Sequence, residues 1–547
     1  MKKRILFSAL LCIAIISGCS VEPSKVTQPE PFRKKKTPFI RIGIMQTNTP
    51  VAFTLTDRAK ITNFDGSFIA RGLRSSTWQA GAEVSSPSLY FYVLVAGSMS
   101  TSENAEAMAL NLKKQGFSSF ILPVKTGSSF SANSGQQKTL FRVCLDKKFT
   151  TREEAAAYKE QIENRLDTFI IKQKIKSAAG TISLKNMITG QVFESAGPIY
   201  ISESNITIHD IIVGKGFHWE SKKTRTYPEK ICLQLDNQGR LAVINILPVE
   251  EYLKGVLPSE MPRSFPLEAL KAQAVAARSE ALAKFGRAHR DDPFDLCADV
   301  HCQVYSGTTQ RTKRTDKAVS ETRGLVLWKN GEICDAVYSA VCGGHTEDSG
   351  NVWGGLTSEY LQGRYDGPPS VRKKYGSLQN ERNIRQWLND VPAAYCNSTG
   401  NVPPSLNYTK KYFRWTKELT QQEIRASIEK YAGRSIGNIV DLQVLSRGVS
   451  GRIVQMTVKG TAGEILLNRE LKIRKALCTS TLWSSCFIVE KKDFSGGIPG
   501  RFILKGAGFG HGVGMCQTGA ARIAIKKGSF MQILNHYYKG ARLKRLY

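Results

Sequence analysis

The alternation of hydrophobic and polar positions is clearest between residues 90 and 172, where a strand–helix–strand pattern occurs twice. Each predicted helix begins near Ser102 or Thr151, whose hydroxyl can accept a hydrogen bond from the first turn, and early glutamates follow it. The predicted order is therefore β-α-β-β-α-β, which indicates a small α+β domain over residues 86–174. The predicted elements are strands at 90–97, 116–123, 140–145 and 167–172 and helices at 102–113 and 151–158.

Patterns outside this repeat predict a second, larger unit of mixed structure at residues 178–547. Strands are predicted at 180–184 and 241–246, and a helix is predicted from Pro266 to Phe285, with Gly286 ending it. Residues 39–85 form a short β-rich segment, too short to assign as a domain, which is compatible with the start of this larger unit. The fold class is thus α+β, with a mixed multi-domain region and one small inserted or preceding domain.

The first residues carry an export signal. Met1 to Arg4 are basic, and the apolar run that follows is too short to span a bilayer. The run ends in Ile-Ser-Gly-Cys at Cys19, which resembles a bacterial lipobox, so residues 1–18 are expected to leave and Cys19 to be lipidated. An ordinary cleaved signal is the alternative. Residues 19–38 are rich in Pro, Lys and Ser and indicate a linker. By resemblance to lipoproteins of two-membrane bacteria, Ser20 favours the outer membrane, facing the periplasm.

Composition adds charge to this picture. The chain has 547 residues and a formal charge of +31, a field that attracts nucleic acid, acidic lipid or an anionic wall polymer. Export argues against nucleic acid as the natural partner. Ten of the twelve cysteines follow Cys19, and an oxidising compartment permits disulfides among them without fixing their connectivity.

The candidate chemistry lies between Asn245 and Ala281. Glu260 stands between Pro258 and Pro262, and no capping role explains it, whereas Glu268 fits the first turn of the predicted helix. Glu250 and Glu251 are predicted to be solvent-exposed residues at the start of a helix. Lys271 and Arg278 lie seven residues apart, on one helical face, where they could hold a sugar near an acid in the turn before that helix. One carboxyl group that no structural role explains suggests general acid–base catalysis on a glycosidic bond.

Two motifs carry a resemblance. Glu260-Met-Pro262 followed by ALKAQAVAAR (269–278), and GHGVGMCQTGA (510–520), are similar to the SpoIID/LytB family of peptidoglycan lytic transglycosylases. The resemblance implies that Glu260 is the one catalytic acid, and that Lys271, Gln273, Arg278, His511 and Tyr360 bind substrate. His511 and Tyr360 also fit as core residues, and Cys516 stands where the family usually has serine. The implied reaction leaves 1,6-anhydro-muramyl ends and requires no cofactor.

The repeat at 86–174 resembles the SPOR domain, which binds glycan strands stripped of peptide stems. The resemblance places Tyr90, Tyr92 and Arg142 near the binding face, although a small domain without a ligand is the alternative. Both modules therefore point to stem-free peptidoglycan as the partner, with a membrane reached through the lipid anchor and an amidase that prepares such strands.

A histidine–cysteine group lies between these motifs. His289, Cys297, His301 and Cys302 are soft ligands at close spacing, which suits a tetrahedral zinc site, and some family members resemble this. A disulfide between Cys297 and Cys302, or from either to Cys342, fits the sequence about equally. Four protein ligands would make a zinc ion structural.

The sequence thus predicts a lytic transglycosylase that cleaves stem-free MurNAc–GlcNAc strands in wall remodelling or division. One alternative is a non-catalytic septal glycan-binding scaffold. The other is a muramidase-type hydrolase that takes a second carboxylate from Asp299, Asp335 or Glu347.

Overall fold

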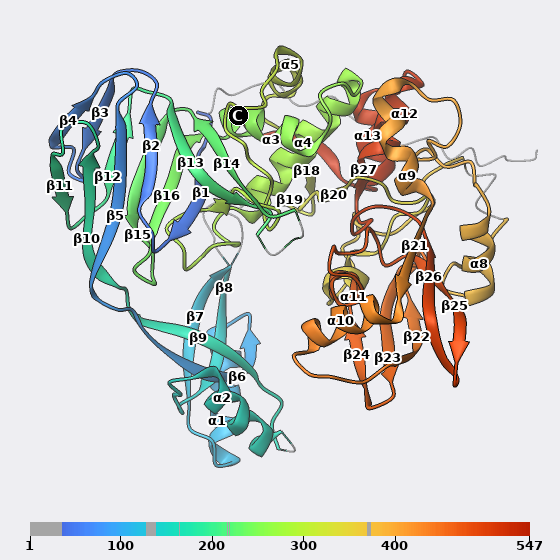
Figure 1. Cartoon of the computed structure of the whole chain (residues 1–547). Coiled ribbons are helices and arrows are strands. Elements are labelled where there is room, and N and C mark those ends of the chain that lie inside the picture. The colour runs from blue at the N-terminus through green and yellow to red at the C-terminus, as the bar shows by residue number, and fades with distance from the viewer. Residues whose placement is uncertain (1–35, 127–137, 164, 216, 218, 369–373) are drawn as a thin grey trace, which may run out of the picture.

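The computed structural model describes residues 36–126, 138–163, 165–215, 217, 219–368 and 374–547. The predicted signal peptide, the lipid site at Cys19 and most of the linker lie outside the described residues. Among the described residues, no helix combines the length and the apolar character that crossing a membrane requires. Helices and strands are mixed throughout, which confirms the α+β class (Figure 1).

Two sheets face each other in the N-terminal part of the molecule (Figure 1). The seven-stranded sheet has the order β17-β1-β16-β15-β12-β3-β4, and the six-stranded sheet has the order β11-β10-β5-β2-β13-β14. Strands from 39–86 pair directly with strands from 179–248, as β1 does with β16 and β5 with β10. Alternate residues of these strands meet between the sheets, where Phe53 and Trp78 are buried. The strands are β1 Phe39–Thr47, β2 Val51–Leu55, β3 Ala59–Thr62, β4 Phe68–Gly72, β5 Thr77–Ser86, β10 Ala179–Asn186, β11 Val192–Ser195, β12 Ile199–Ser202, β13 Ile206–Val213, β14 Ser221–Tyr227, β15 Lys230–Leu235, β16 Leu241–Pro248 and β17 Leu296–Cys297.

The small domain is inserted between β5 and β10, and Ser86 and Ala179 are direct partners across the two strands. Its elements are β6 Leu89–Met99, α1 Ser102–Lys114, β7 Ser119–Thr126, β8 Lys138–Leu145, α2 Arg152–Ile162 and β9 Phe169–Lys176, in the sheet order β7-β8-β6-β9. Thr101, one residue before the predicted start, caps α1, and Thr151 forms a capping box with Glu154 at α2.

The three residues expected near a glycan-binding face of this domain do not lie together. Tyr92 packs with Leu94 and Val143 in the core beneath the helices, whereas Arg142 alternates with Val143 and so points to the opposite face of the sheet. The hydroxyl of Tyr90 donates to the carbonyl of Asn237 at 3.0 Å, which makes it part of the junction with the sandwich. Tyr90 and Tyr92 are therefore not exposed beside Arg142.

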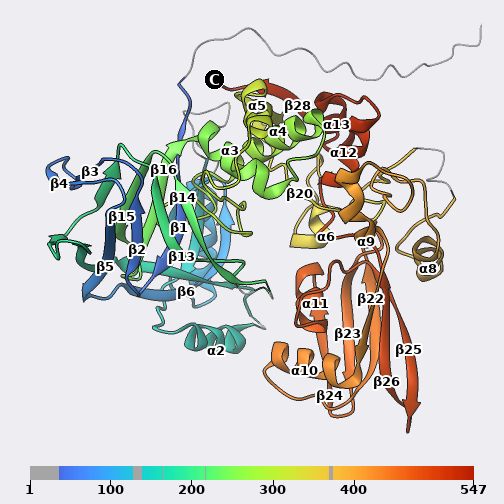
Figure 2. The ribbon, with the colours of Figure 1, turned by 45° about the horizontal axis from the view of Figure 1, so that its top comes forward.

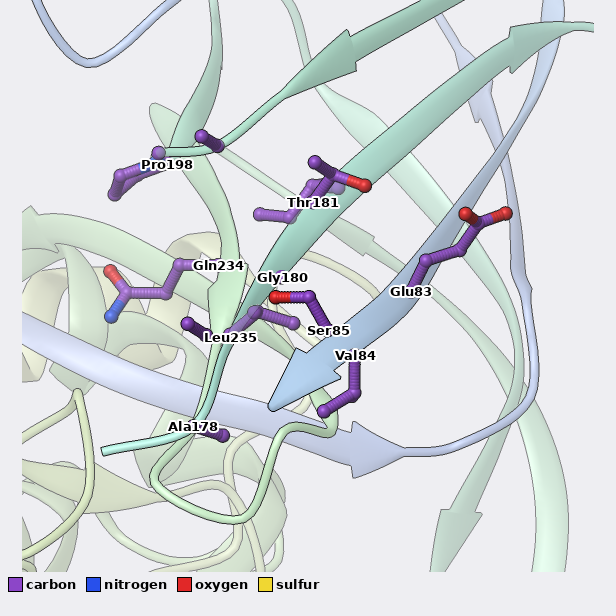
Figure 3. A pocket seen from close by; sticks show the side chains of 13 residues that line it. Glu83, Val84, Ser85, Ala178, Gly180, Thr181, Pro198, Gln234 and Leu235 are labelled. Atoms are coloured by element: carbon purple, nitrogen blue, oxygen red, sulfur yellow. The ribbon is translucent and has the colours of Figure 1, made fainter. Parts of the chain in front are cut away.

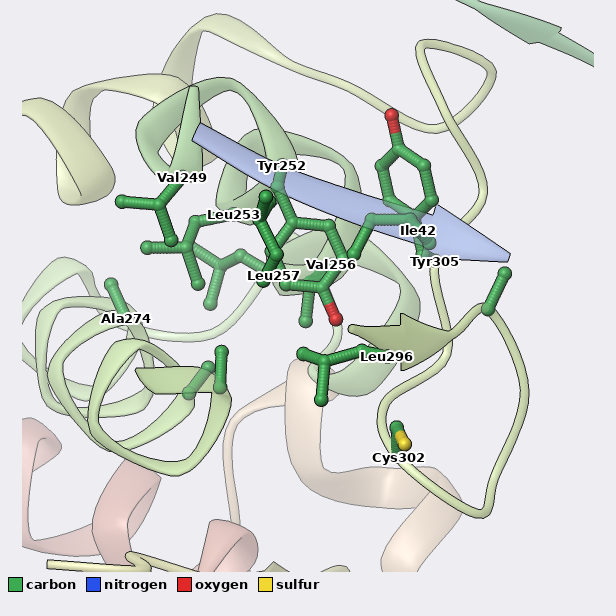
Figure 4. Packing of buried hydrophobic residues seen from close by; sticks show 14 of the residues in the cluster. Ile42, Val249, Tyr252, Leu253, Val256, Leu257, Ala274, Leu296, Cys302 and Tyr305 are labelled. Atoms are coloured by element: carbon green, nitrogen blue, oxygen red, sulfur yellow. The ribbon is translucent and has the colours of Figure 1, made fainter. Parts of the chain in front are cut away.

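Two helices after β16 connect the sandwich to the rest of the molecule. α3 spans Val249–Glu260 and α4 spans Leu267–Lys284, so the helix predicted at 266–285 is confirmed to within one residue at each end. Figure 4 shows Val249, Leu253, Val256 and Leu257 of α3 packed with Ile42 and Leu296 in one apolar cluster. The sequence pattern places Glu260 in the turn before the helix at 266–285. The structure instead makes it the last residue of α3.

The remaining residues complete this helical layer and add a second lobe (Figures 1 and 2). The lobe has its own core around Trp415, Ile424 and Ile453, between two three-stranded sheets and two helices. The helical layer includes α5 Lys313–Glu321, β18 Leu325–Lys329, β19 Glu332–Ile333, β20 Tyr338–Ser339, α6 Ser349–Trp353, β27 Met515–Cys516, α12 Gln517–Ile525, α13 Phe530–Tyr537 and β28 Arg542–Arg545. The lobe and its approach comprise α8 Glu381–Asn389, the 3-10 helix Pro404–Thr409, α9 Lys410–Phe413, β21 Trp415–Thr420, α10 Gln421–Ala432, β22 Ile439–Arg447, β23 Ile453–Gly460, β24 Gly463–Asn468, α11 Glu470–Leu477, β25 Phe487–Ser495 and β26 Ile498–Gly506.

Candidate functional site

Glu260 is held at the end of α3 by two contacts from distant parts of the chain. The backbone N–H of Val304 donates to the Glu260 Oε1 atom at 2.7 Å. The side-chain Nε2 of Gln517, at the start of α12, donates to the backbone carbonyl of Glu260 at 2.9 Å. The apolar face of α3 is buried in the main core, so the helix itself has little freedom to move. The carboxyl group is thus fixed in place while its side chain stays partly exposed.

The surroundings of Glu260 favour its protonated form. Burial among protein atoms is the main cause, and it raises the pKa of this carboxyl from 4.5 to about 7. The hydrogen bond from Val304 and the charge of Lys284 act in the opposite direction, while the nearby Glu280 carboxylate raises the pKa further. A carboxyl with this pKa is protonated in a large fraction of molecules near neutral pH, as a general acid requires.

Glu260 lines a cavity of about 770 Å³ between the helical layer and the second lobe. Glu280 and Lys284 of α4 and Asp335 line the same cavity. The Lys284 Nζ atom lies 2.5 Å from Glu280 Oε1, and burial raises the pKa of both Glu280 and Asp335. Glu260, Glu280, Asp335 and Lys284 thus give this part of the lining three carboxyl groups and an ammonium group, which suits a ligand rich in hydroxyl groups.

A buried hydrogen-bond chain positions Glu280. Gln303 donates from Nε2 to Glu280 Oε2 at 2.9 Å, and its Oε1 accepts from the hydroxyl of Tyr252 at 3.0 Å. The same Nε2 atom lies 3.2 Å from the hydroxyl of Tyr338, which also lines the cavity. Because each polar group in this chain has a partner, the Glu280 carboxylate is held in a fixed orientation.

Other residues that line the cavity are aromatic and cationic. The ring of Trp353 is 45% exposed and lies 5.1 Å from the ring of His511, centroid to centroid. Arg469 and Arg474 of the second lobe line the same cavity. An exposed indole beside guanidinium groups suits stacking on a sugar ring and contact with its acidic or acetamido substituents.

The structure brings some of the predicted substrate residues to the cavity. His511 and Tyr360 line it, and the Tyr360 hydroxyl accepts from the backbone N–H of Asp335 at 3.0 Å. The pKa of His511 is lowered to about 3, chiefly by burial and then by Arg452 and Arg474, so its imidazole stays neutral. Gln273 is fully buried behind the cavity, where its Oε1 accepts from Gln517, and so acts on Glu260 only through that residue.

Lys271 and Arg278 do not reach the cavity. Lys271 forms ion pairs with Glu268 at 2.8 Å and Glu321 at 2.7 Å. Arg278 is fully buried and forms a bidentate pair with Glu250, at 2.9 and 2.8 Å. Glu250 is therefore not a solvated helix start but the buried partner of Arg278. The helical spacing placed the two cations on one face correctly, but that face packs against the core.

The predicted zinc residues lie together beside the cavity. One ligand atom from each of His289, Cys297, His301 and Cys302 lies within 4.8 Å of the other three. Cys302 Sγ is 3.4 Å from both His289 Nε2 and His301 Nδ1, and Cys297 Sγ is 3.7 Å from His301 Nδ1. The His289 Nδ1 atom is 2.8 Å from an Asp292 carboxylate oxygen, the usual support for a metal-binding imidazole. All ten described cysteines are free thiols, including Cys297 and Cys302.

Sequence reasoning missed Glu280 and Lys284. Glu280 lies seven residues after Gln273 on α4, and Lys284 follows at the (i, i+4) position, so a helical projection from Gln273 could have found both. The Val-Trp pattern at Trp353 suggests either stacking on a sugar ring or packing in the core, and the structure places this residue, exposed, in the cavity lining.

A second cavity, of about 640 Å³, lies along the edge of the sandwich (Figure 3). Figure 3 shows Glu83 and Thr181 on two paired strands, with Pro198 and Gln234 across from them. Glu83 is its single ionisable lining residue, and it is exposed. This cavity lacks the grouped acids and bases of the cavity at Glu260.

Comparisons with known proteins match three separate parts of the chain. The SPOR domain profile matches residues 88–172, that of stage II sporulation protein matches 237–328, and a domain of unknown function matches 347–514. An uncharacterised protein of Brachyspira hyodysenteriae is 31% identical over 305 residues, which cover 55% of this chain and 67% of that protein. The amidase enhancer of Bacillus subtilis is 30% identical over 53% of this chain and 40% of its own length. Stage II sporulation protein D of Bacillus amyloliquefaciens is 27% identical over a region that covers 54% of this chain and 73% of that protein.

Proposed function

We propose, from the premise that this chain belongs to the SpoIID family and carries a SPOR domain, that it is a lytic transglycosylase acting on stem-free peptidoglycan. The family is linked to the cell wall and to sporulation and is associated with peptidoglycan degradation. The finer assignment is supported above all by one observation: Glu260, with a pKa raised to about 7, lines the same cavity as an exposed tryptophan, Trp353.

In the proposed reaction Glu260 acts twice. Its protonated carboxyl group donates to the bridging oxygen as the bond between that oxygen and the MurNAc C1 atom breaks. The resulting carboxylate then takes the proton from the 6-hydroxyl of the same sugar as its oxygen bonds to C1. The acid is regenerated, the product has a 1,6-anhydro end, and no water is consumed. Trp353 would support the sugar ring, and Arg469 would contact its lactyl carboxylate.

A hydrolase is the second candidate, because Glu280 and Asp335 line the same cavity as Glu260 and could activate a water molecule. Lys284 favours the ionised form of both groups. Asp335 therefore remains a candidate for the second carboxylate of a muramidase-type hydrolase, and Glu280 is a further candidate. Glu347 is less suited, because its carboxylate is already occupied by Ser450 and Asn351.

The test is the chemistry of the released ends. Stem-free glycan is digested in water enriched in ¹⁸O, and the products are analysed by mass spectrometry. A transglycosylase gives anhydro ends without the label, whereas a hydrolase gives labelled reducing ends. Glu260→Gln should lower the rate by about 10²–10⁴. Glu83→Gln, in the other cavity, is the matched control and should leave it unchanged. Binding without any cleavage by the wild type would support the scaffold alternative.

The quartet of His289, Cys297, His301 and Cys302 fits a structural zinc ion in this proposal, because two thiols and two imidazoles converge and Asp292 supports one of them. Such an ion would supply no chemistry to the reaction. It would fix the loop that continues to Val304, the residue that donates to Glu260.

The place of action follows from the two domains, which are those of an extracytoplasmic protein of the cell envelope. We extend this to a lipid anchor at Cys19 on the outer membrane and to an amidase that produces stem-free strands; the name of the Bacillus subtilis relative, amidase enhancer, supports the second point. Cys19→Ala should release the protein from membranes or leave an unprocessed precursor. Correctly processed variant protein that still partitions into detergent would refute the anchor.

A further inference from the structure

A second group of metal-binding side chains lies apart from the quartet. Cys342, Asp366, Cys396 and Cys516 come from four separate segments, and each is at most 2% exposed. One ligand atom from each lies within 4.8 Å of the other three. The arrangement encloses the four atoms completely, which differs from the quartet, where His301 is exposed.

The spacing suits a tetrahedral ion. Cys342 Sγ lies 3.4 Å from Cys396 Sγ and 3.1 Å from Asp366 Oδ2. Around a zinc ion with Zn–S bonds of about 2.3 Å, neighbouring ligand atoms are separated by roughly 3.5–3.8 Å. An outward shift of a few tenths of an ångström would therefore complete the site, without any movement of the backbone.

The outer contacts prepare two of the ligands. Asp366 Oδ1 accepts from the hydroxyl of Tyr537 at 2.8 Å and lies 3.1 Å from His536 Nε2, which leaves Oδ2 directed to the thiols. Cys516 Sγ accepts from the backbone N–H groups of Cys342 at 3.3 Å and Gly519 at 3.4 Å. Such outer hydrogen bonds orient metal ligands and stabilise a thiolate.

Charge provides an independent argument. Arg414 lies beside the group and donates to four backbone carbonyls, among them that of Gly343 at 3.0 Å. Among the described residues Arg414 forms no ion pair, although its charge helps to lower the pKa of the nearby Asp390 carboxyl. A half-buried guanidinium group is stabilised by further negative charge close to it. Three thiolates, one carboxylate and a divalent ion carry a net charge of about −2, which would compensate Arg414.

We propose that Cys342, Asp366, Cys396 and Cys516 bind a second structural zinc ion. Thiolates select zinc over the harder divalent cations, and a site with four protein ligands and no exposed position is closed. The ion would fix the start of α12, where Gln517 follows Cys516 and donates to the backbone of Glu260. The competing outcome is a Cys342–Cys396 disulfide, which would need the two sulfur atoms to approach to about 2.05 Å.

The test counts zinc in the full chain, purified from an extracytoplasmic compartment so that oxidation can occur. The double variant Cys297→Ser, Cys302→Ser removes the quartet, and we expect it to retain about one equivalent of zinc per chain. Adding Cys396→Ser should remove that equivalent. Adding Cys334→Ser, a buried thiol outside both groups, is the matched control and should keep it. Cobalt in place of zinc should give thiolate-to-metal absorption that only Cys396→Ser abolishes.

Two results would overturn the proposal. One is a folded double variant, by circular dichroism, that carries no zinc; the other is a Cys342–Cys396 disulfide in unreduced peptides. If the double variant fails to fold, the wild type decides: two equivalents of zinc support the second site, and one equivalent refutes it. None of these measurements depends on glycan cleavage, so failure of the proposed enzyme activity would leave the result unaffected.

Discussion

Replacing Glu260 by Gln should make the protein more stable at neutral pH while abolishing its activity. The amide keeps the shape of the side chain and can still accept the hydrogen bond from Val304, but it carries no charge. The wild-type carboxyl group must be ionised at a site where burial opposes ionisation. The substitution therefore removes an unfavourable term from the folded state.

The magnitude follows from the pKa. A rise from 4.5 in the unfolded chain to about 7 in the folded one corresponds to about 3 kcal/mol, at about 1.36 kcal/mol per pH unit. Because the side chain is partly exposed, solvent reduces this value, and about 1–3 kcal/mol is the expected range. Between pH 4.5 and 7 the folded protein holds one proton more than the unfolded chain, so wild-type stability falls as the pH rises through this window. The glutamine variant lacks this dependence.

The assay is thermal unfolding of both proteins from pH 4.5 to 8.5. The unfolding temperatures should nearly coincide at pH 4.5, separate as the pH rises, and stay separated by a constant amount above pH 7. Glu83→Gln, at an exposed carboxyl group, should show no separation at any pH. The wild-type cleavage rate should fall about tenfold per pH unit above 7, because the acid must be protonated. A constant difference between Glu260→Gln and wild type at every pH would refute the reasoning.

Four further outcomes are expected. Lys271→Ala should change stability by less than about 1 kcal/mol and leave KM unaltered, because its ion pairs are partly solvated; a raised KM would restore its substrate role. Arg278→Met should destabilise the fold by about 3–5 kcal/mol in chemical denaturation, because a buried carboxylate loses its partner. Cys297→Ser should remove one equivalent of zinc by elemental analysis, and a Cys297–Cys302 disulfide in unreduced peptides would contradict this. Joining Ser86 to Ala179 through a two-residue turn should remove the SPOR domain without unfolding the sandwich; the product should cleave soluble glycan normally but sediment less with amidase-treated sacculi.

The sequence predicted those parts of the site that depend on local spacing. The α4 helix and the closeness of His289, Cys297, His301 and Cys302 both arise within a few turns of chain, where periodicity and ligand spacing are informative. Periodicity also placed Lys271 and Arg278 on one face but could not say what that face packs against. The surroundings of Arg278 depend in part on Tyr547, near the C-terminal end of the sequence, whose hydroxyl donates to Glu250, the partner of Arg278.

Contacts between distant segments could not be predicted in this way. Cys342 and Cys516 are 174 residues apart, and they meet because β20 and β27 pair in parallel next to them. Trp353 reaches the cavity only through the placement of the second lobe. The approach of the two cysteines depends on strand pairing, and the position of Trp353 depends on lobe packing. A single sequence specifies neither of these.

The two proposed metal sites are linked to the proposed catalytic acid, Glu260, through the two hydrogen bonds that hold it. The N–H group that holds the Glu260 carboxyl belongs to Val304, two residues after Cys302. The amide that holds the Glu260 backbone belongs to Gln517, one residue after Cys516. Each contact to the acid therefore comes from a residue adjacent to a different proposed metal site. A single acid that acts first as donor and then as acceptor needs its position held within a fraction of an ångström through both steps. Two metal ions, bound at the sites proposed beside Val304 and Gln517, would supply that rigidity at both contacts to Glu260.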